Sequence, residues 1–481
     1  MENTIHILLR QHVGAPCVPC VREGQRVQRG TLLAEPAGLG ANLYASVSGV
    51  VQELRDDRIV LLPDAQQSED YLPLNVPEGT DKRGIVALAG IVGMGGAGFP
   101  TAAKLNCELP DGYVLLNAAE CEPGLVHNIR RIERQAQKLL SGVRHCMDIT
   151  HAPRAIIAIK EKNEAAVRAL REALGSESAI TLHLLPDLYP MGEERAVVRE
   201  CLGVSLRVDQ LPSAAGAVVV NAETAFRIAE AIDEHRPCIS KDVTVRGKLS
   251  GGSGEHVFFD VPIGTSASSL LERAGGIEGE YGEIIMGGAF TGRSVSPDEP
   301  ITRTTGAVLV TDPLPDLHGE KLGLLVCACG GSEARMRGLA EKMHAEVACV
   351  CRCKQAVEPR PGAALKCERP GICPGQAGNN LKFKKAGCTH ILIGNCSDCT
   401  NTVMASAPSM GLNVHHMTDH AMTAVGHALY RALPKPPAPP QEETAEGETQ
   451  SVCIESGAFH IRIASGKNIE ISLPVARKDI K

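Results

Sequence analysis

A run of glycines near residue 95 restricts the fold more than any other feature of this sequence. The segment IVGMGGAGFPTAAKLN, residues 91–106, has Gly93, Gly95, Gly96 and Gly98 within six positions. Glycine lets a backbone turn sharply and lets its N–H groups approach a ligand closely. We therefore expect bare backbone to be presented at a turn that follows an apolar strand.

The spacing of Gly93, Gly95 and Gly98 formally matches the GxGxxG pattern of dinucleotide-binding βαβ units. Pro100, however, interrupts the start of the crossover helix. Only about a dozen residues separate the loop from the next predicted strand, YVLLNAAE, which is too few for a full crossover. The loop is therefore predicted to bind its ligand in a different α/β arrangement.

Groups suited to a nucleotide surround this loop in the sequence. Lys104 can supply charge to a phosphate, and the Phe99 ring can stack on a flat ligand. The segment NAAECEPG, residues 117–124, ends a predicted strand with an amide and two carboxylates, and ribose hydroxyls are natural partners for carboxylates. The residues themselves thus favour a flat, phosphorylated ligand.

Composition and charge exclude several classes of protein. The chain has 481 residues, which is enough for about three or four domains. A net charge of -7 argues against nucleic acid as the main partner. The N-terminal residues lack the pattern of a secretory signal, and no stretch approaches the roughly 18 apolar residues of a membrane span. We therefore expect a cytoplasmic protein without a transmembrane segment.

Hydrophobic periodicity and turn residues divide the chain into six parts, which together predict a multidomain α/β protein. The predicted parts are a small β domain at 1–70, an α/β domain with a mostly parallel sheet at 75–235, a compact β-grasp-like domain at 240–312, a cysteine-rich α/β domain at 321–432, a solvated linker at 433–450 and a small β tail at 451–481.

Cysteines are concentrated in the fourth of these parts. Ten of the 18 lie between Cys327 and Cys399, and in an unsecreted chain such density indicates metal, cluster or redox-active thiols. Cys327 and Cys329 follow one predicted strand and Cys396 follows another, so a parallel sheet would place them at one edge. An iron–sulfur cluster, a zinc site and a dithiol pair of Cys396 and Cys399 all remain open on this pattern.

Other cysteines and histidines carry weaker signals. Cys17 and Cys20 form a second CxxC, which needs a turn at Pro19 because strand positions three apart face opposite sides. The group of His415, His416 and His420 is interpreted as the surface at a helix entry. Isolated cysteines are predicted to be inert small apolar residues, and these are Cys107, Cys146, Cys201, Cys238 and Cys453.

Four ordered motifs carry a resemblance to a known family. GMGGAGFPTAAK, NAAECEPG, YPMGEERAVV and VVVNAETAF resemble the NADH-binding flavoprotein subunit of respiratory complex I and, more closely, the C subunit of the Rnf complex. The opening HVGAPCVPCVREGQRVQRGTLLAE looks like the barrel-sandwich domain of the Rnf subunit, and residues 240–312 are similar to its soluble-ligand-binding β-grasp (SLBB) domain. In all, the resemblance spans roughly residues 5–312.

This resemblance implies a flavin site with a second nucleotide above it. FMN would lie against the glycine loop and NADH would stack near Phe99. Met94 and Ala119 depart from the complex I subunit, which carries arginine and aspartate there. The implied cofactor-binding residues are Gly93, Met94, Gly95, Gly96, Phe99, Lys104, Asn117, Glu120, Glu122, Gly192, Glu193, Glu194, Asn221 and Thr224.

The cysteine-rich part departs from the Rnf subunit, which continues with two ferredoxin-type CxxCxxCxxxCP motifs that this chain lacks. It looks instead like the N-terminal domain of heterodisulfide reductase A subunits. That resemblance implies one [4Fe-4S] cluster, with ligands drawn from Cys327, Cys329, Cys373, Cys396 and Cys399. In the dithiol alternative, Cys396 and Cys399 would be the catalytic thiols.

The combination of these two halves resembles the electron-transfer proteins associated with D-proline reductase. It implies an NADH-dependent oxidoreductase that passes electrons through FMN, and then an iron–sulfur centre or redox thiols, to a partner reductase in a complex or oligomer. FMN suits this role because it accepts two electrons together and releases them singly. The alternatives are a non-catalytic adaptor subunit with structural zinc and an NADH-dependent flavin dithiol oxidoreductase without a cluster.

Overall fold

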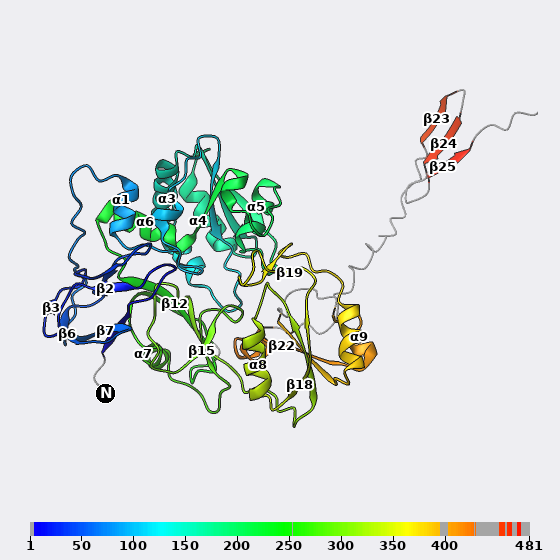
Figure 1. Cartoon of the computed structure of the whole chain (residues 1–481). Coiled ribbons are helices and arrows are strands. Elements are labelled where there is room, and N and C mark those ends of the chain that lie inside the picture. The colour runs from blue at the N-terminus through cyan, green and yellow to red at the C-terminus, as the bar shows by residue number, and fades with distance from the viewer. Residues whose placement is uncertain are drawn as a thin grey trace, which may run out of the picture. The chain divides into compact units, whose positions relative to one another are not determined.

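The computed structural model describes residues 4–252, 254–394, 403–427 and 429, together with the backbone of three strands between 452 and 472. The chain divides into two compact units, residues 1–433 and 434–481 (Figure 1). In the first unit, four sheet-containing domains follow one another along the chain. They are the N-terminal β domain, the central domain, the mixed-sheet domain and the cysteine-rich domain.

The N-terminal β domain is built from short antiparallel strands because buried and exposed residues alternate along them. In β1, for example, Ile5 and Ile7 are buried while His6 and Leu8 are half-buried. The two sheets have the orders β1-β7-β6-β3 and β2-β4-β5. Their strands are β1 (Ile5–Leu8), β2 (Cys17–Pro19), β3 (Arg26–Val27), β4 (Leu32–Pro36), β5 (Leu43–Tyr44), β6 (Gly49–Leu54) and β7 (Arg58–Pro63).

The central domain has the mostly parallel sheet that the alternating strands and helices predict. Its order is β10-β9-β8-β11, and every pairing is parallel. The strands are β8 (Tyr113–Ala118), β9 (Arg154–Lys160), β10 (Ile180–Leu185) and β11 (Ala217–Asn221). The helices are α1 (Lys82–Leu88), α2 (Thr101–Lys104), α3 (His127–Thr150), α4 (Glu164–Leu174), α5 (Glu194–Leu202) and α6 (Ala222–Glu234), with a 3-10 turn η1 (Pro212–Ala215).

The strand order places a topological switch point between β8 and β11. From β8 the chain moves outward through β9 to β10, and then returns to the other side of β8 as β11. Loops that follow the two strands diverge at such a point and leave a crevice at their carboxyl ends. The predicted lack of a full crossover helix after the glycine loop is also observed, because α2 has only four residues.

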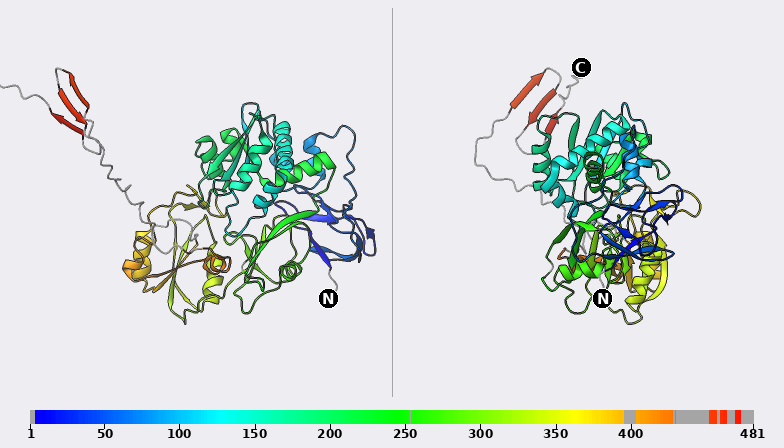
Figure 2. Two further views of the ribbon diagram at one scale, coloured as in Figure 1. Left: turned by 180° about the vertical axis from the view of Figure 1, so that it is seen from behind. Right: turned by 90° about the vertical axis from the view of Figure 1, so that its left-hand side faces the viewer.

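The mixed-sheet domain has the order β13-β12-β16-β14-β15. It is formed by β12 (Ser240–Gly247), β13 (His256–Pro262), α7 (Ala267–Arg273), β14 (Ile284–Met286), β15 (Arg293–Val295) and β16 (Ala307–Val310). The strand β15 was not expected from the sequence, because three largely exposed residues are too few to show a period of two. Figures 1 and 2 show this domain between the N-terminal β domain and the cysteine-rich domain.

The cysteine-rich domain has a parallel sheet of order β18-β17-β21-β22. Beside this sheet, β19 and β20 form a separate antiparallel pair, and β19 lies near α5 of the central domain (Figure 1). The elements are β17 (Lys321–Val326), α8 (Glu333–Lys342), β18 (Glu346–Arg352), β19 (Ala356–Val357), β20 (Lys366–Cys367), α9 (Ala377–Lys385), β21 (His390–Ile393), η2 (Pro408–Met410), β22 (Asn413–His416) and α10 (Asp419–Ala424).

The second unit contains an antiparallel sheet of β23 (Val452–Ser456), β24 (Phe459–Ile463) and β25 (Ile469–Ser472). The sequence predicts a small β structure here, and the described backbone has three strands rather than a hairpin. The predicted linker at 433–450 lies outside the described residues. Among the described helices of the whole chain, none combines the length and the apolar character that a bilayer crossing requires.

Candidate functional site

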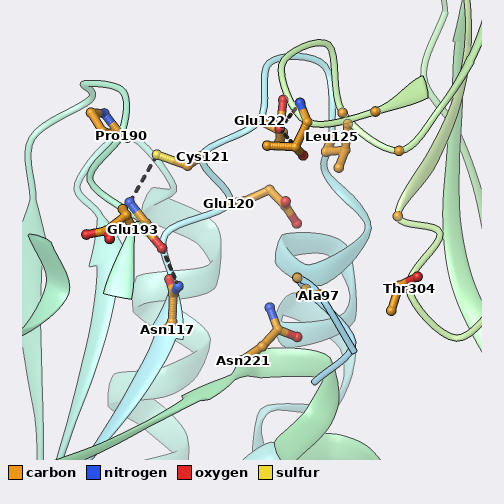
Figure 3. Close-up of a pocket in the computed structure, with 18 of the residues that line it drawn as sticks. Ala97, Asn117, Glu120, Cys121, Glu122, Leu125, Pro190, Glu193, Asn221 and Thr304 are labelled. Carbon is orange, nitrogen blue, oxygen red and sulfur yellow. Dashed lines mark hydrogen bonds between the residues drawn. The ribbon is translucent and has the colours of Figure 1, made fainter. Parts of the chain in front are cut away.

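A cavity of about 680 Å³ opens where the central, mixed-sheet and cysteine-rich domains meet. The central domain contributes the glycine loop, the ends of β8 and β11, and the segments 120–128 and 189–195. The mixed-sheet domain contributes residues around 286–293 and 302–306, and the cysteine-rich domain contributes the turn after β17 and the segment around β20. Figure 3 shows Ala97, Glu120 and Asn221 around the open space, with Thr304 on the opposite side.

The glycine loop forms one wall of this cavity with unused backbone donors. Three bonds hold the loop. Gly93 N–H donates to the Phe99 carbonyl at 2.9 Å, Met94 N–H donates to Thr224 Oγ1 at 2.9 Å, and the Gly98 carbonyl accepts from Val13 N–H at 3.1 Å. In the described part of the chain, the N–H groups of Gly95, Gly96 and Ala97 donate to no other group. Successive unpaired N–H groups in a concave turn attract a phosphate or the polar edge of a ring.

Two asparagines at the ends of adjacent strands lie beside this loop. Asn117 and Asn221 face each other in the register of β8 and β11. The oxygen of Asn221 caps α6 by accepting from Glu223 N–H at 3.0 Å, while Asn117 Nδ2 donates to the Gly192 carbonyl at 2.8 Å. A Cβ at Gly95 would lie 2.3 Å from Asn221 Nδ2, so a side chain at this position would have to displace the Asn221 amide that caps α6.

Glu120 and His127 form a buried polar group in the cavity wall. Glu120 has the unusual positive φ of 38° and accepts a hydrogen bond from Asn128 Nδ2 at 2.8 Å. His127 Nδ1 lies 4.0 Å from Glu120 Oε2. Burial lowers the pKa of His127 to about 4, although nearby Glu120 opposes this shift. The imidazole is therefore neutral at neutral pH.

Glu122 ties the central domain to the loop between β14 and β15. Its carboxylate accepts from Phe290 N–H at 2.9 Å, from Thr291 N–H at 3.0 Å and from Thr291 Oγ1 at 2.6 Å. Burial raises the pKa of this carboxyl, and the bonds from Thr291 and Phe290 oppose the rise. Glu122 lines the cavity, but both of its oxygens already serve this contact.

The structure distributes the sequence-predicted cofactor residues between the cavity wall and its surroundings. Lys104 Nζ pairs with Glu194 Oε1 at 2.5 Å, and Phe99, 40% exposed, lies outside the lining. The predicted residues in the lining are Met94, Gly95, Gly96, Asn117, Glu120, Glu122, Gly192, Glu193 and Asn221, and those outside it are Gly93, Phe99, Lys104, Glu194 and Thr224. A cofactor role for each of them stays a prediction.

Cysteine side chains form part of the cavity wall. Cys121, Cys329 and Cys367 line it. The neighbouring Cys329 thiol lowers the pKa of the Cys367 thiol to about 7. The neighbouring Cys327 and Cys367 thiols, with burial, raise the pKa of Cys329.

The predicted metal ligands are only partly within the described residues. Cys327 and Cys329 follow β17 as expected, Cys373 is exposed, and Cys396 and Cys399 lie outside the described residues. Among residues that the structure describes, no group of three or more His, Cys, Asp or Glu side chains is arranged to hold a metal ion. The cluster ligand set and the catalytic role of Cys396 and Cys399 therefore stay predictions.

Sequence reasoning missed three features of the cavity. It did not separate Cys367 from the other clustered cysteines, because the short β19–β20 pair has no recognisable period. It also missed Tyr189, which stacks on Phe290 with ring centroids 3.9 Å apart, and Arg195, which donates to the Cys367 carbonyl at 2.7 Å. The YPMGEERAVV motif contains Tyr189 and Arg195, but nothing local indicates contacts to such distant parts of the chain.

The structure also bears on the two weaker sequence signals, the CxxC at Cys17 and Cys20 and the histidine group. Cys17 is buried and Cys20 is exposed, so this CxxC does not form a pair. The interpretation of the histidine group as a surface is wrong for His416 and His420, which are 3% and 4% exposed. His420 Nε2 lies 2.8 Å from Glu283 Oε1, so it packs against the mixed-sheet domain instead.

Family models match the first half of the chain. Residues 1–67 match the RnfC barrel sandwich hybrid domain, and residues 86–230 match the Nuo51 FMN-binding domain. These matches correspond to the N-terminal β domain and the central domain described above.

Curated relatives extend this similarity. The chain is 33% identical over 331 residues to the C subunit of the proton-translocating ferredoxin:NAD(+) oxidoreductase complex of Clostridium ljungdahlii, covering 64% of this chain and 71% of that protein. It is 31% identical over 317 residues to the C subunit of the Na(+)-translocating complex of Acetobacterium woodii, covering 62% and 71%. Cobalamin reductase PduS of Salmonella typhimurium is 38% identical over 234 residues, covering 48% of this chain and 49% of that protein.

The fold and the cavity thus define a protein of the flavin-binding oxidoreductase class. The chain belongs to the RnfC family, within the superfamily that includes the complex I 51-kDa flavoprotein subunit. The predictions of this family and of an oxidoreductase subunit are confirmed.

Proposed function

We propose that this protein takes hydride from NADH onto FMN held in the cavity and passes the electrons through its cysteine-rich domain to a partner reductase. The unpaired N–H groups of Gly95, Gly96 and Ala97, at a topological switch point, are the observation that carries this proposal. The match of residues 86–230 to an FMN-binding domain supports it, as do relatives named as ferredoxin:NAD(+) oxidoreductase subunits.

The cavity fits FMN in size and in donor chemistry. A volume of about 680 Å³ lies within the usual range for cofactor sites. A Cβ at Gly96 would meet no atom within 4 Å, so this backbone faces open space in which a ligand can lie against it. Of the two departures, Ala119 is buried outside the cavity lining, whereas the buried Met94 is part of that lining.

Each residue near the loop has a definable task in this scheme. Thr224 accepts a hydrogen bond from Met94 N–H, and the three following residues, whose N–H groups are unpaired, line the cavity. Asn221 packs against Gly95, and the neutral His127 keeps a positive charge away from the buried wall. FMN, when bound, supplies the conversion between two-electron and one-electron transfer.

The exit for electrons is proposed to lie at the cysteine-bearing wall. The proposed carrier is an iron–sulfur centre with ligands among Cys327, Cys329, Cys373, Cys396 and Cys399, or a redox thiol pair. Cysteine thiols in the cavity wall support a thiol route. A partner of the proline-reductase type is proposed from the sequence resemblance, and membership of a complex is supported by relatives named as complex subunits.

The variant Gly96→Ala tests FMN binding, because it should leave the structure of the FMN-free protein unchanged. Its methyl group meets nothing in the structure but would enter the space proposed for FMN. Overpacking a filled site costs about 1–3 kcal/mol, so FMN affinity in a fluorescence titration should fall by about 5- to 150-fold. The matched control is Gly338→Ala in α8, where a Cβ also meets nothing within 4 Å and which lies outside the cavity lining.

The proposed function fails if the oxygen-free protein neither retains added FMN nor bleaches it with NADH. It also fails if Gly96→Ala and Gly338→Ala bind FMN equally. Iron and acid-labile sulfide assays on the same preparation distinguish a cluster from thiols. A colourless protein that contains zinc would instead favour the adaptor function.

A further inference from the structure

We infer that Arg199 and Gly371 are positioning residues, which hold the cysteine-bearing wall of the cavity against the central domain so that electrons leave the proposed flavin across a short gap. They belong to two facing segments, residues 189–199 of the central domain and residues 367–371 of the cysteine-rich domain, which together we call the interdomain clamp. This role rests on the proposed function, because the flavin is the source of the electrons.

The central-domain side of the clamp is part of the cavity wall. Tyr189, Gly192 and Arg195 line the cavity. Asn117 Nδ2 donates to the Gly192 carbonyl at 2.8 Å, and Gly192 N–H donates to Cys121 Sγ at 3.1 Å, as the dashed lines in Figure 3 show. The carboxyl end of β8 thus holds this side of the clamp at the place proposed for flavin.

Three side chains of this segment donate to backbone carbonyls of the cysteine-rich domain. These bonds run from Tyr189 Oη to Cys329, from Arg195 Nη2 to Cys367 at 2.7 Å and from Arg199 Nη1 to Pro370 at 2.7 Å. The three acceptor residues all line the cavity, although Cys329 follows β17 and Pro370 follows β20. One segment of the central domain therefore holds two separate parts of the cysteine-bearing wall.

Arg199 acts on this wall from outside the cavity. It lies in α5 and does not line the cavity, and its side chain is 19% exposed. Its Nε and Nη2 donate to Glu200 Oε1 at 2.9 and 2.8 Å, which orients Nη1 toward the Pro370 carbonyl. A change at Arg199 therefore removes a hydrogen bond to the wall but takes no group from the space proposed for FMN.

Gly371 brings the two domains into close contact from the other side. Its φ is +82°, and a Cβ there would lie 2.6 Å from Met191 Cε and 3.7 Å from Pro190 Cδ. Met191 is 4% exposed, so its methyl group has little room to move aside. A side chain at position 371, which also lies outside the cavity lining, should push the cysteine-bearing segment away from the central domain.

The clamp is separate from the contacts that anchor the body of the cysteine-rich domain. Glu283 of the mixed-sheet domain accepts hydrogen bonds from α8 and lies against a histidine of α10. Neither helix contributes an acceptor to the clamp. Loss of the clamp should therefore shift the cavity wall while the domain stays attached.

The position of the wall matters because the rate of a reaction step depends steeply on geometry, and a misplacement of about 1 Å can cost on the order of a hundred-fold. In this step two electrons leave the NADH-reduced flavin one at a time and enter the carrier proposed above. The flavin is oxidised and the carrier is reduced, and the two flavin protons pass to solvent or, in the thiol route, to the two sulfurs. Loosening the clamp should slow this step and leave hydride transfer from NADH unchanged.

Hydrogen exchange of the full chain without FMN tests the clamp itself. In Arg199→Gln and in Gly371→Ala, the amides of residues 368–372 should exchange about five-fold faster or more, because a hydrogen bond or a close contact is lost. The matched controls are Arg207→Gln, which removes a surface pair, and Gly362→Ala, where φ is +77° and a Cβ meets nothing within 4 Å. Exchange in the clamp variants no faster than in these controls would overturn the inference.

A single turnover of the oxygen-free, FMN-loaded protein tests the effect on electron transfer. After one equivalent of NADH, the flavin absorption of the parent should bleach and then recover as the electrons move into the cysteine-rich domain. In Arg199→Gln and Gly371→Ala, bleaching should keep its rate, and recovery should slow by about ten-fold or more. Arg199→Lys keeps a charged donor and should recover at nearly the parent rate.

The outcomes of the two experiments separate this role from the proposed function. If the parent does not retain FMN or NADH does not bleach it, the proposed function fails, and hydrogen exchange still tests the clamp. Recovery at one rate in parent and variants would overturn the positioning role while the flavin site stands. A parent flavin that stays bleached, or clamp variants that slow bleaching as much as recovery, would also overturn it.

Discussion

His127 shows how burial sets the charge of a single residue in the cavity wall. Its side chain is 3% exposed, and its two nitrogens lie 4.0 Å from Glu120 Oε2 and 3.8 Å from Glu223 Oε2. These carboxylates favour a protonated imidazole, but desolvation outweighs them and lowers the pKa to about 4. The neutral ring accepts or donates a hydrogen bond with Thr244 Oγ1 at 3.2 Å.

This burial predicts a loss of stability in mild acid. Between the unfolded pKa near 6.5 and the folded pKa of about 4, the unfolded chain binds a proton that the folded chain rejects. Stability should therefore fall as the pH drops through this window, by at most about 3 kcal/mol from His127. In His127→Asn, urea midpoints should change less between pH 7 and pH 4.5 than in the parent.

The half-exposed His183 provides the control for this measurement. His183→Asn should keep the acid sensitivity of the parent. If His127→Asn and His183→Asn lose stability equally on acidification, desolvation of His127 does not contribute as we expect.

At the scale of elements, one carboxylate orders the loop between β14 and β15. Glu122 accepts three hydrogen bonds from Phe290 and Thr291, and a Cβ at Gly288 would lie 2.0 Å from its Cδ. The loop therefore needs both the carboxylate and the absence of a side chain at Gly288. Because the loop carries Phe290 against Tyr189, its order also affects the cavity wall.

Replacing Glu122 by alanine should loosen this loop. Two backbone N–H groups and a hydroxyl would lose their acceptor, at a cost of about 1–3 kcal/mol. Hydrogen exchange of peptides that contain Phe290 and Thr291 should become faster, with little change in β8 and β9. Glu278→Ala, at an exposed position of the same domain, should leave these rates unchanged. Unaltered protection in Glu122→Ala would show that the loop is held by other contacts.

At the scale of the whole first unit, a buried carboxylate joins two domains. Glu283, just before β14, accepts from Arg335 Nη1 at 2.9 Å, from Lys342 Nζ at 2.9 Å and has His420 Nε2 at 2.8 Å. Its side chain is 1% exposed, and the hydrogen bonds from His420 and Arg335 hold its pKa well below the usual range against desolvation. The mixed-sheet domain thereby anchors both α8 and α10 of the cysteine-rich domain.

Removing the Glu283 charge should detach the cysteine-rich domain from the mixed-sheet domain, while the other domains of the first unit stay folded. Breaking a buried ion pair costs about 3–5 kcal/mol, so Glu283→Gln should make the connection at 312–320 more sensitive to limited proteolysis. Glu333→Gln removes a surface pair with Arg337 and should cost at most about 1 kcal/mol. Equal cleavage rates in the two variants would contradict the role of Glu283.

The sequence alone determined the local chemistry of the site and the class of fold. The glycines near residue 95, the strand-ending Asn117 and Asn221, and the alternation of strands with helices were all visible as patterns. Such patterns are local, because period, turn residues and strand ends depend on neighbours in the chain. They were enough to predict a parallel sheet with a nucleotide-type loop at its edge.

Only the tertiary structure decided which distant residues share the cavity. It paired Lys104 with Glu194 outside the lining, and it gave Glu122 hydrogen-bond donors in a loop 168 and 169 residues further along the chain. It also placed Cys329 and Cys367 in the wall of one cavity. These contacts depend on how domains pack, and packing acts between surfaces that no local period encodes. The physical reason is that side-chain contacts across domains arise from long-range burial and charge pairing rather than from the order of residues in the chain.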